Sequence, residues 1–520
     1  MNDVNSHFRF VLFATAVTAI GGFLFGYDTA VINGANSFLT AHLKLTPSQE
    51  GLAGASAILG CVPGAMCSGF LSDRFGRKRF YMTCVALFTL SSLLCGLSTS
   101  LGMLIFFRII QGAGGGGLGP SEQAILADNF LPEQRGMGFA MYGMAVVLAP
   151  AIGPTLGGWI TDNYNWHWIF FINVPVGILS LYLTERLVED PPWIADAQER
   201  AKHEPVDYTG LALVAVGLGT LQVVLDKGER EDWFSSHFIQ IFSVICVIAL
   251  VSFVIWEWHE KHPVLDLRML RFRNLAVSNV LMFVLGFVLY GSTVMIPQFL
   301  QNVMGYTAKL AGMALSPGGL VVMTLMPIVG MMVSRVDARK MIAFGFIALG
   351  LSMFHMMGMY PGIDFHTAMM YRIYQSIGMA FLFVPINTIC YSGVPQEDNN
   401  QVSSMINLMR NLGGSFGISF VTTILSRRIQ VHSSELISNT ATGNPAMERM
   451  LHGMSGYFSV HGAGVGGLMQ AYGSIYATLM REAAVLAYRD TNFIMGVVTL
   501  SALPLLLLTQ RPKPGIHMGH

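Results

Sequence analysis

Residues 69–79 read Gly69-Phe-Leu-Ser-Asp73-Arg74-Phe-Gly76-Arg77-Lys-Arg79, a short basic segment between two long apolar runs. Gly69 allows two helices to approach closely, Gly76 allows a tight turn, and Asp73 can pair with Arg77 or cap the following helix. The enrichment of cytoplasmic loops in Lys and Arg explains the charges but not the spacing of Gly and Asp. We therefore interpret the segment as a specific structural element that joins two helices.

A degraded copy of this segment lies in the second half of the chain, at Gly330-Met-Met-Val-Ser-Arg-Val-Asp-Ala-Arg-Lys340. Each copy is followed by an arginine inside an apolar run: Arg108 in Arg-Ile-Ile-Gln-Gly and Arg372 in Arg-Ile-Tyr-Gln-Ser. An ionisable residue in a transmembrane helix is costly and usually faces a partner or a watery cavity. Two similar halves that each carry such an arginine are typical of a secondary transporter.

The overall composition is that of a membrane protein. Hydrophobic residues make up 53% of the chain and charged residues only 12%, whereas about 25% of residues are charged in soluble globular domains. Thirty basic residues balance thirty acidic ones, so no overall basicity indicates a nucleic-acid partner. The first apolar run is too long for a signal peptide, and we expect it to remain as the first span.

Fourteen segments reach the length of about 20 apolar residues that crosses a bilayer. Spans 7 and 8 interrupt the repeat, so we expect a six-helix bundle at 1–190, two inserted spans at 191–270, and a second six-helix bundle at 271–520 with a long exterior loop, 426–490. The side that holds the termini has 18 basic residues and the other side has 9, which predicts cytoplasmic termini. The expected spans are 10–32, 51–71, 80–99, 102–127, 136–160, 166–188, 208–226, 237–258, 275–299, 309–333, 340–360, 366–391, 403–425 and 491–509.

The long exterior loop contains one helical pattern. Ile475, Leu479, Ala483 and Leu486 fall on one helical face. We expect a surface helix there, and loose chain in the Gly-rich stretch from Gly453 to Gly467.

Asp28 is the only acidic residue well inside the first span, and by helical rise it reaches a depth similar to that of Arg108. A buried carboxylate beside a guanidinium can change between charged and neutral forms as its solvation changes, which a proton-coupled site requires. A static ion pair or an interfacial Asp is the alternative. Glu122, near the cytoplasmic end of span 4, is either a second proton site or a snorkelling interfacial acid.

Four polar residues of the second half are candidates for the lining of a substrate cavity: Arg372, Gln375, Asn387 and Arg410. We expect no metal, because the Met-rich stretch around His355 is better explained by adaptable packing than by copper(I) binding. The run Gly114–Gly117 lacks a following Gly-Lys-Ser/Thr, so it predicts no nucleotide site. We therefore expect no cofactor and no enzyme activity, and energy from a proton gradient.

The fifth span contains Ala149-Pro-Ala-Ile-Gly153-Pro154-Thr-Leu-Gly157-Gly158. Its glycines let a facing helix pack closely, and its prolines free backbone groups and bend the helix. The spacing of these residues alone does not distinguish a functional role of the motif from a purely structural kink in the helix.

These motifs resemble the major facilitator superfamily. The 69–79 segment matches its Gly-x-x-x-Asp-Arg-x-Gly-Arg-Lys loop, and the fifth span is similar to the antiporter motif of its drug-exporting branches. Trp166-His-Trp-Ile-Phe-Phe-Ile-Asn-Val-Pro is similar to the Trp-Arg-Trp-Ile-Phe-x-Ile-Asn-x-Pro run of fourteen-span drug:proton antiporters of the EmrB/QacA type, although His167 replaces the usual arginine. Asp207-Tyr-Thr-Gly and Arg410-Asn-Leu-Gly-Gly also match that branch, so the resemblance covers nearly the whole chain.

The resemblance implies an all-α membrane protein with the major facilitator fold, in which two six-helix bundles surround a cavity and two extra helices lie at the periphery. It implies proton-coupled export of small amphipathic or cationic compounds by alternating access, from the inner membrane. Membrane lipid and a periplasmic membrane-fusion adaptor are the implied partners, and no nucleic acid is. The implied roles are a proton carrier at Asp28 with Arg108 as charge partner, a latch at Gly69, Asp73, Arg74, Gly76 and Arg77, and a flexible packed seam at Gly153, Pro154, Gly157 and Gly158.

Residues 21–35 also resemble the first span of sugar porters, so proton-coupled uptake of a sugar or other polar solute is an alternative. The segment Glu189-Asp-Pro-Pro-Trp after span 6 lacks the Pro-Glu-Ser-Pro-Arg of that family, and the two extra spans also argue against it. A non-transporting receptor or scaffold is a third hypothesis.

Overall fold

A computed structural model of the chain describes residues 2–45, 47–130, 134–188, 207–438, 444–460 and 466–510. Within these ranges the secondary structure is helical and contains no strand. Ten helices in the described part are long and apolar enough to cross a membrane. The chain is therefore an all-α, multi-pass membrane protein, as the sequence predicts.

Each expected span overlaps a helix; 166–188 falls on the α6–α7 pair and 491–509 runs from α17 into η6, while the count of fourteen spans stays a prediction. The N-terminal half comprises α1 (Asn2–Leu43), α2 (Pro47–Phe75), α3 (Arg77–Gly96), α4 (Leu101–Asn129), α5 (Arg135–Asn163), α6 (Trp168–Phe171) and α7 (Asn173–Leu187). Then come α9 (Tyr208–Lys227), η1 (Trp233–Ser235), α10 (His237–His259) and η2 (Leu267–Arg271). The C-terminal half comprises α11 (Arg273–Asn302), α12 (Ala308–Val333), α13 (Ala338–Met356), α14 (Phe365–Cys390), η3 (Gln396–Asp398), α15 (Asn399–Ser438), α16 (Pro445–Phe458), α17 (Gly467–Ser501) and η6 (Leu503–Leu508).

Local sequence signals define several helix ends. Ser100 caps α4 by accepting a hydrogen bond from the Met103 amide, and Asp207 caps α9 by accepting one from the Gly210 amide at 2.8 Å. Gly76 joins α2 to α3 with a φ of +89°. That left-handed conformation favours glycine and confirms the tight turn expected there.

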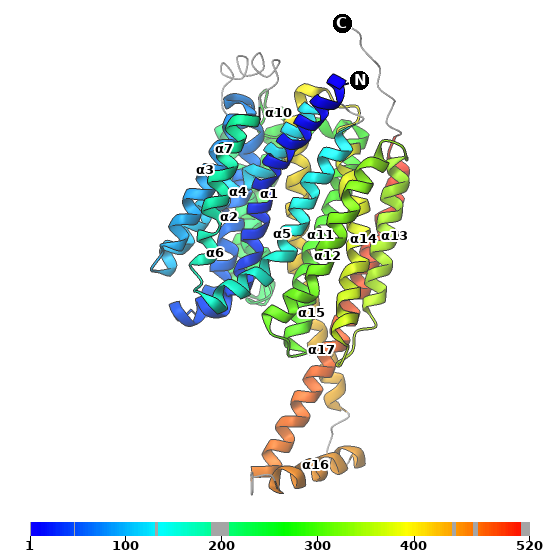
Figure 1. The fold of residues 1–520 in the computed structure, drawn as a ribbon. Coiled ribbons are helices and arrows are strands. Elements are labelled where there is room, and N and C mark those ends of the chain that lie inside the picture. Colours follow the sequence, from blue (N-terminus) through cyan, green and yellow to red (C-terminus); the bar gives the residue numbers. More distant parts are fainter. Residues whose placement is uncertain are drawn as a thin grey trace.

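Each half is a bundle of closely packed helices. In the N-terminal half α2 packs on α4 and α1 on α5, and in the C-terminal half α11 packs on α15 and α12 on α14. Glycines allow this approach: a Cβ on Gly112 of α4 would lie 1.9 Å from the Ala57 carbonyl oxygen, and one on Gly417 of α15 would lie 2.1 Å from that of Phe287. The halves lie side by side in Figure 1 and meet through α5 with α12, and through α15 with α2 and α4.

The two inserted helices form a hairpin at the periphery. Helices α9 and α10 pack on each other, and α9 also contacts α2 and α15. Helix α10 leaves most of its apolar side chains exposed, which suits a helix that faces lipid. These side chains include Ile241, Val244, Val247, Ile248, Val251 and Ile255.

The segment between α15 and the last span differs from the expected loop. Gly453 and Gly456 lie in α16, so the prediction of loose chain is wrong for this part, and residues 461–465 lie outside the described residues. Ile475 to Leu486 is helical, but it continues into the last span as α17 and forms no separate surface helix. Its apolar face is satisfied by packing on α15 and α16. Figure 1 shows α16 and the start of α17 projecting from the end of the bundle opposite Asn2.

The expected boundary at residue 190/191 also lies outside the described residues.

Candidate functional site

Helices α1, α4 and α7 converge on the Asp28 carboxylate. It forms an ion pair with Arg108 of α4, and it accepts hydrogen bonds from Gln111 Nε2 at 2.8 Å and from Asn173 Nδ2 at 3.3 Å. Asp28 is 1% exposed and Arg108 0%, so an interfacial Asp is the wrong interpretation. The pairing predicted from equal depth in two spans is present.

A further layer of contacts holds these donors in place. Asn173 Nδ2 also donates to Ser92 Oγ of α3 at 3.0 Å, and Ser92 Oγ donates to the Phe170 carbonyl at 3.0 Å. The Arg108 guanidinium lies 5.7 Å from the centre of the Phe170 ring. In such a low-dielectric site, loss of one partner of an ion pair typically costs about 3–5 kcal/mol.

Sequence reasoning did not select Gln111 and Asn173. Gln111 is three residues after Arg108 and therefore shares its helical face, and Asn173 is a lone amide after Ile169-Phe-Phe-Ile172. These two signals were available in the sequence, but neither identifies Asp28 as the common acceptor.

Glu122 of α4 is fully buried. Its carboxylate faces the backbone of α1, since a Cβ on Gly21 or on Gly22 would lie 2.6 Å from one of its oxygens. The snorkelling interpretation is therefore wrong. Among the described residues Glu122 forms no ion pair, and it remains a second buried acid on the helix that carries Arg108.

Arg410 of α15 joins the two halves near their centre. Its Nη1 donates to Tyr142 Oη of α5 at 3.2 Å, and Tyr142 Oη donates to Asn407 Oδ1 at 3.3 Å. Asn407 Nδ2 in turn donates to Gln123 Oε1 of α4 at 2.8 Å. Because Arg410 is buried at this junction, it faces the protein interior, as expected of a cavity residue, and not lipid.

Arg372 and Gln375 lie within the C-terminal half. Arg372 Nη1 donates to Gln375 Oε1 at 2.5 Å, and Nη2 lies 3.5 Å from Thr293 Oγ1 of α11. Asn387, further along α14, is buried and donates to the Phe383 carbonyl of its own helix. Arg410, at the junction of the halves, also approaches α14, since its guanidinium lies 5.9 Å from the centre of the Phe383 ring.

The segment 69–79 contacts the opposite half at the end of the bundle that holds Asn2. Asn400 Nδ2 of α15 donates to Asp73 Oδ1 at 2.7 Å and to the Gly69 carbonyl at 2.8 Å. The hydroxyls of Ser68 and Ser404 lie 3.3 Å apart. These hydrogen bonds therefore join the end of α2, in the N-terminal half, to α15 of the C-terminal half.

A second bridge lies beside it. Arg77 forms an ion pair with Asp128 of α4, and Asn399 Nδ2 of α15 donates to Asp128 Oδ1 at 2.9 Å. The Arg74 guanidinium lies over the Phe70 ring of its own helix, 5.9 Å from the ring centre. Arg77 thus supports an inter-half contact through Asp128.

The glycine motif of α5 faces α1 in part. A Cβ on Gly153 would lie 2.6 Å from the Ala30 Cβ, and one on Gly157 would lie 2.6 Å from Val31 Cγ2. Gly158 is buried, and no described atom lies within 4 Å of a Cβ placed on it, so its place in the packed seam stays a prediction. The side chain of Pro154 lies outside the described residues.

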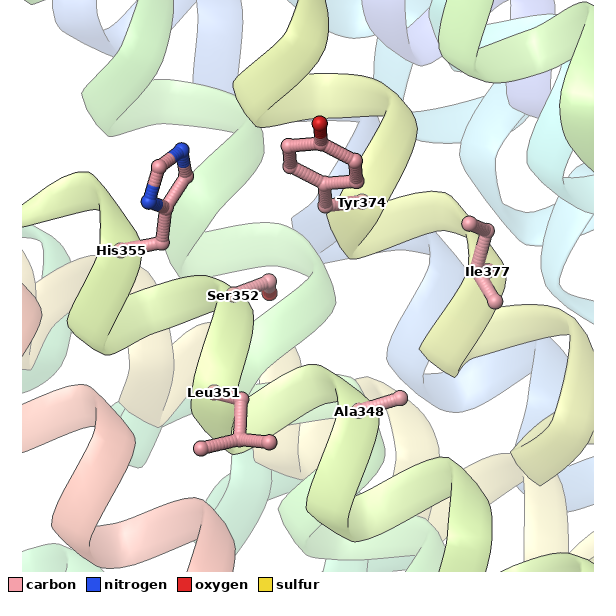
Figure 2. A pocket seen from close by; sticks show the side chains of 6 residues that line it. All are labelled: Ala348, Leu351, Ser352, His355, Tyr374 and Ile377. Carbon is pink, nitrogen blue, oxygen red and sulfur yellow. The ribbon is translucent and has the colours of Figure 1, made fainter.

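A groove of about 280 Å³ lies between α13 and α14. Figure 2 shows Ser352 and His355 of α13 opposite Tyr374 of α14. The lining is mostly apolar, and it includes none of the expected site residues. It consists of Ala348, Leu351, Ser352, His355, Tyr374 and Ile377.

Comparison with known families decides the identity of the fold. Residues 18–418 match the model of the Major Facilitator Superfamily. The chain belongs to this superfamily. It is 32% identical over 499 residues to the multidrug export protein EmrB of Escherichia coli K12, covering 96% of this chain and 95% of the relative.

Other relatives place this superfamily member in the drug:proton antiporter family, as the motifs predict. EmrB of Haemophilus influenzae is 38% identical over 390 residues, 75% of each chain. The fatty acid resistance protein FarB of Neisseria gonorrhoeae is 30% identical over 493 residues, 95% of this chain and 94% of the relative.

Solved structures of the superfamily confirm the fold. The proton:xylose symporter XylE superposes with a TM-score of 0.60 at 18% identity, covering 94% of both chains. The human organic anion transporter MFSD10 superposes with a TM-score of 0.57 at 13% identity, covering 95% of this chain and 99% of that one. At these identities the likeness concerns the fold alone.

Proposed function

We propose that the protein exports small amphipathic compounds in exchange for protons, by alternating access between its two halves. The observation that carries the proposal is the buried Asp28 cluster, in which one carboxylate accepts from Arg108, Gln111 and Asn173. The names of the EmrB relatives, which are multidrug export proteins, support the direction and the substrate class.

In this mechanism Asp28 carries the proton. A proton on the carboxylate removes its negative charge, so its attraction to Arg108 weakens and one acceptor for Gln111 and Asn173 is lost. Since these partners belong to α4 and α7 while Asp28 belongs to α1, protonation changes how the helices of this bundle are held together. The buried Glu122 on α4 is the second candidate for proton binding.

Alternating access requires contacts between the halves that can break and re-form. The Asn400–Asp73 and Asn399–Asp128 hydrogen bonds are suited to this role, because single hydrogen bonds contribute only about 0.5–1.5 kcal/mol net, or about 1.5–3 kcal/mol when one partner is charged. Arg410 and Tyr142 form the next contact inward. Opening this end would expose the Arg410 junction to solvent, where a substrate can bind.

The proposal includes fourteen spans in the inner membrane with both termini cytoplasmic. The basic residues support this orientation, since 18 lie on the terminal side and 9 on the other. Helix α16 and the start of α17 would then project on the exterior side, where a membrane-fusion adaptor could contact them.

Transport in everted membrane vesicles tests the function. With the cytoplasmic face outward and the interior acidified, a fluorescent amphipathic compound should accumulate inside, and dissipation of the proton gradient should release it. Failure of a broad compound panel to accumulate, or accumulation that is insensitive to the gradient, would contradict proton-driven export. Gradient-driven uptake of sugars into right-side-out vesicles would favour the symporter alternative.

A further inference from the structure

The internal repeat allows the Asp28 cluster to be compared with the same place in the C-terminal half. Leu24-Phe25-Gly26-Tyr27-Asp28 of α1 corresponds to Leu289-Tyr290-Gly291-Ser292-Thr293 of α11. Arg108-Ile-Ile-Gln111 of α4 corresponds to Arg372-Ile-Tyr-Gln375 of α14. Thr293 therefore occupies the position that Asp28 occupies in the first half.

The structure preserves the geometry of the repeat. Arg108 points from α4 to Asp28 of α1, and Arg372 points from α14 to Thr293 of α11, with Nη2 3.5 Å from Oγ1. In both halves the arginine Nη1 also donates to the glutamine three residues later. The second half thus keeps the donors of the first half but has a neutral hydroxyl where the first half has a carboxylate.

One buried donor that is paired in the first half is left over in the second half. Gln111 Nε2 donates to Asp28, but Gln375 Nε2 has no hydrogen-bond partner among the described residues. Arg372 Nε has none either, as is also true of Arg108 Nε in the first half. No described carboxylate lies within ion-pair distance of Arg372, which is only 2% exposed. Buried polar groups are nearly always paired, and an unpaired buried charge is costly. The arrangement lacks one negatively charged acceptor.

We propose that the Arg372–Gln375 site of α14, facing Thr293 of α11, binds a monovalent anion in place of the missing carboxylate. The Thr293 hydroxyl donates to the Leu289 carbonyl at 2.7 Å, so the guanidinium and the Gln375 amide supply the free donors. An organic carboxylate or a halide has the required charge, and a carboxylate can accept two parallel hydrogen bonds from a guanidinium. The site is distinct from the proton-binding acids and does not depend on proton exchange.

Thermal unfolding of the purified full chain in detergent tests anion binding at this site and does not require a measurement of transport. Sodium chloride, sodium benzoate or neutral benzamide is titrated into the protein in a low-salt zwitterionic buffer, and the variants described below control for the general effect of ionic strength. Chloride, benzoate or both should raise the melting temperature saturably, since a ligand that binds only the folded state stabilises it, and benzamide should not. A response to benzoate alone identifies an organic carboxylate, and a response to chloride alone identifies an inorganic anion.

Two variants of matched shape locate the response. Thr293→Asp supplies the missing carboxylate inside the protein, so the response should disappear or its midpoint concentration should rise at least about tenfold. Thr293→Asn has nearly the same shape without the charge and should retain the response. If Thr293→Asp does not fold, Gln375→Leu serves instead, and loss of its hydrogen bond to the anion should raise the midpoint about tenfold.

The proposal is overturned if neither anion stabilises the wild type, if Thr293→Asp (or Gln375→Leu in its place) responds like the wild type, or if Thr293→Asn loses the response as well. Failure of proton-driven export in vesicles would leave this result untouched, because binding is measured on purified protein without a membrane potential or a gradient.

Discussion

At the scale of single residues, the protein concentrates polar groups that an apolar bundle would otherwise exclude. Three helices contribute the side chains of one such cluster, and each is almost fully buried. The Asp28 carboxylate forms an ion pair with Arg108 and accepts hydrogen bonds from Gln111 and Asn173. Such a network is stable only while its charges match, because the low dielectric that strengthens each contact also penalises an unpaired group. Protonation of the Asp28 carboxylate therefore changes the interactions of every residue in this network.

Asp28→Asn should abolish proton-driven export, because asparagine keeps the size of the side chain but removes its titratable group. Substrate-induced proton release, measured in detergent with a pH-sensitive dye, should fall to background. Asp162→Asn, at an exposed acid near the end of α5, is the control and should behave as wild type. Release of wild-type size from Asp28→Asn would exclude Asp28 as carrier and make Glu122 the next candidate.

Arg108→Gln should be equally damaging, because it leaves the buried Asp28 carboxylate without its charge partner. We expect a loss of stability of about 3–5 kcal/mol, seen as a lower melting temperature together with lost export. The double variant Asp28→Asn with Arg108→Gln should be more stable than Arg108→Gln alone, since it leaves no unpaired charge. Additive losses in the double variant would show that the two groups do not interact.

At the scale of elements, glycines decide which helices touch. In α5, a Cβ on Gly157 would lie 2.6 Å from Val31 Cγ2 of α1, whereas no described atom lies within 4 Å of a Cβ on Gly158. Adjacent helix positions point about 100° apart, so one glycine can be essential to packing while its neighbour is not. Substitution of Gly157 therefore tests whether transport needs the α1–α5 contact.

Gly157→Leu should abolish export while leaving protein detectable in the membrane. The added side chain must displace Val31, and overpacking typically costs about 1–3 kcal/mol. Gly102→Leu, at an exposed position of α4 where no described atom lies within 4 Å of an added Cβ, is the control and should retain most of the activity. Membrane immunoblots and the vesicle assay measure both quantities, and equal activity of the two variants would mean that the α1–α5 contact is not needed for transport.

At the scale of the whole molecule, two bundles are tied at the end that holds Asn2 by polar contacts between α2, α4 and α15. They lie beside closely packed contacts between α5 and α12, where a Cβ on Gly136 would lie 2.8 Å from the Gly330 carbonyl oxygen. The polar contacts are the part of this junction that a change of charge can weaken. The 69–79 segment, recognisable in the sequence, forms one side of it.

Asp73→Asn should leave insertion in the membrane intact but slow transport several-fold. The change removes the charge that strengthens the hydrogen bond from Asn400, and so alters the balance between closed and open states at this end. Initial export rates at equal protein level measure the effect. An unchanged rate would mean that the segment acts only as a basic anchor.

The orientation of the whole molecule can be tested with introduced cysteines. Gly456→Cys in the exposed α16 should react with an impermeant thiol reagent in intact spheroplasts, and no described atom lies within 4 Å of a Cβ at that position. Lys261→Cys, in the loop before α11, should react only after permeabilisation. The reverse pattern would invert the proposed topology.

Hydropathy, length and charge asymmetry along the chain determined the helices, their repeat and the pairing of Asp28 with Arg108, because each depends on distance along a helix or across a bilayer. Only the tertiary structure identified Gln111 and Asn173 as partners of Asp28, joined Asp73 to Asn400, placed Gly157 against Val31, and set Thr293 opposite Arg372. These facts depend on the rotation of each helix about its axis and on the choice of its neighbour. Both are set by packing between residues up to 336 positions apart in sequence.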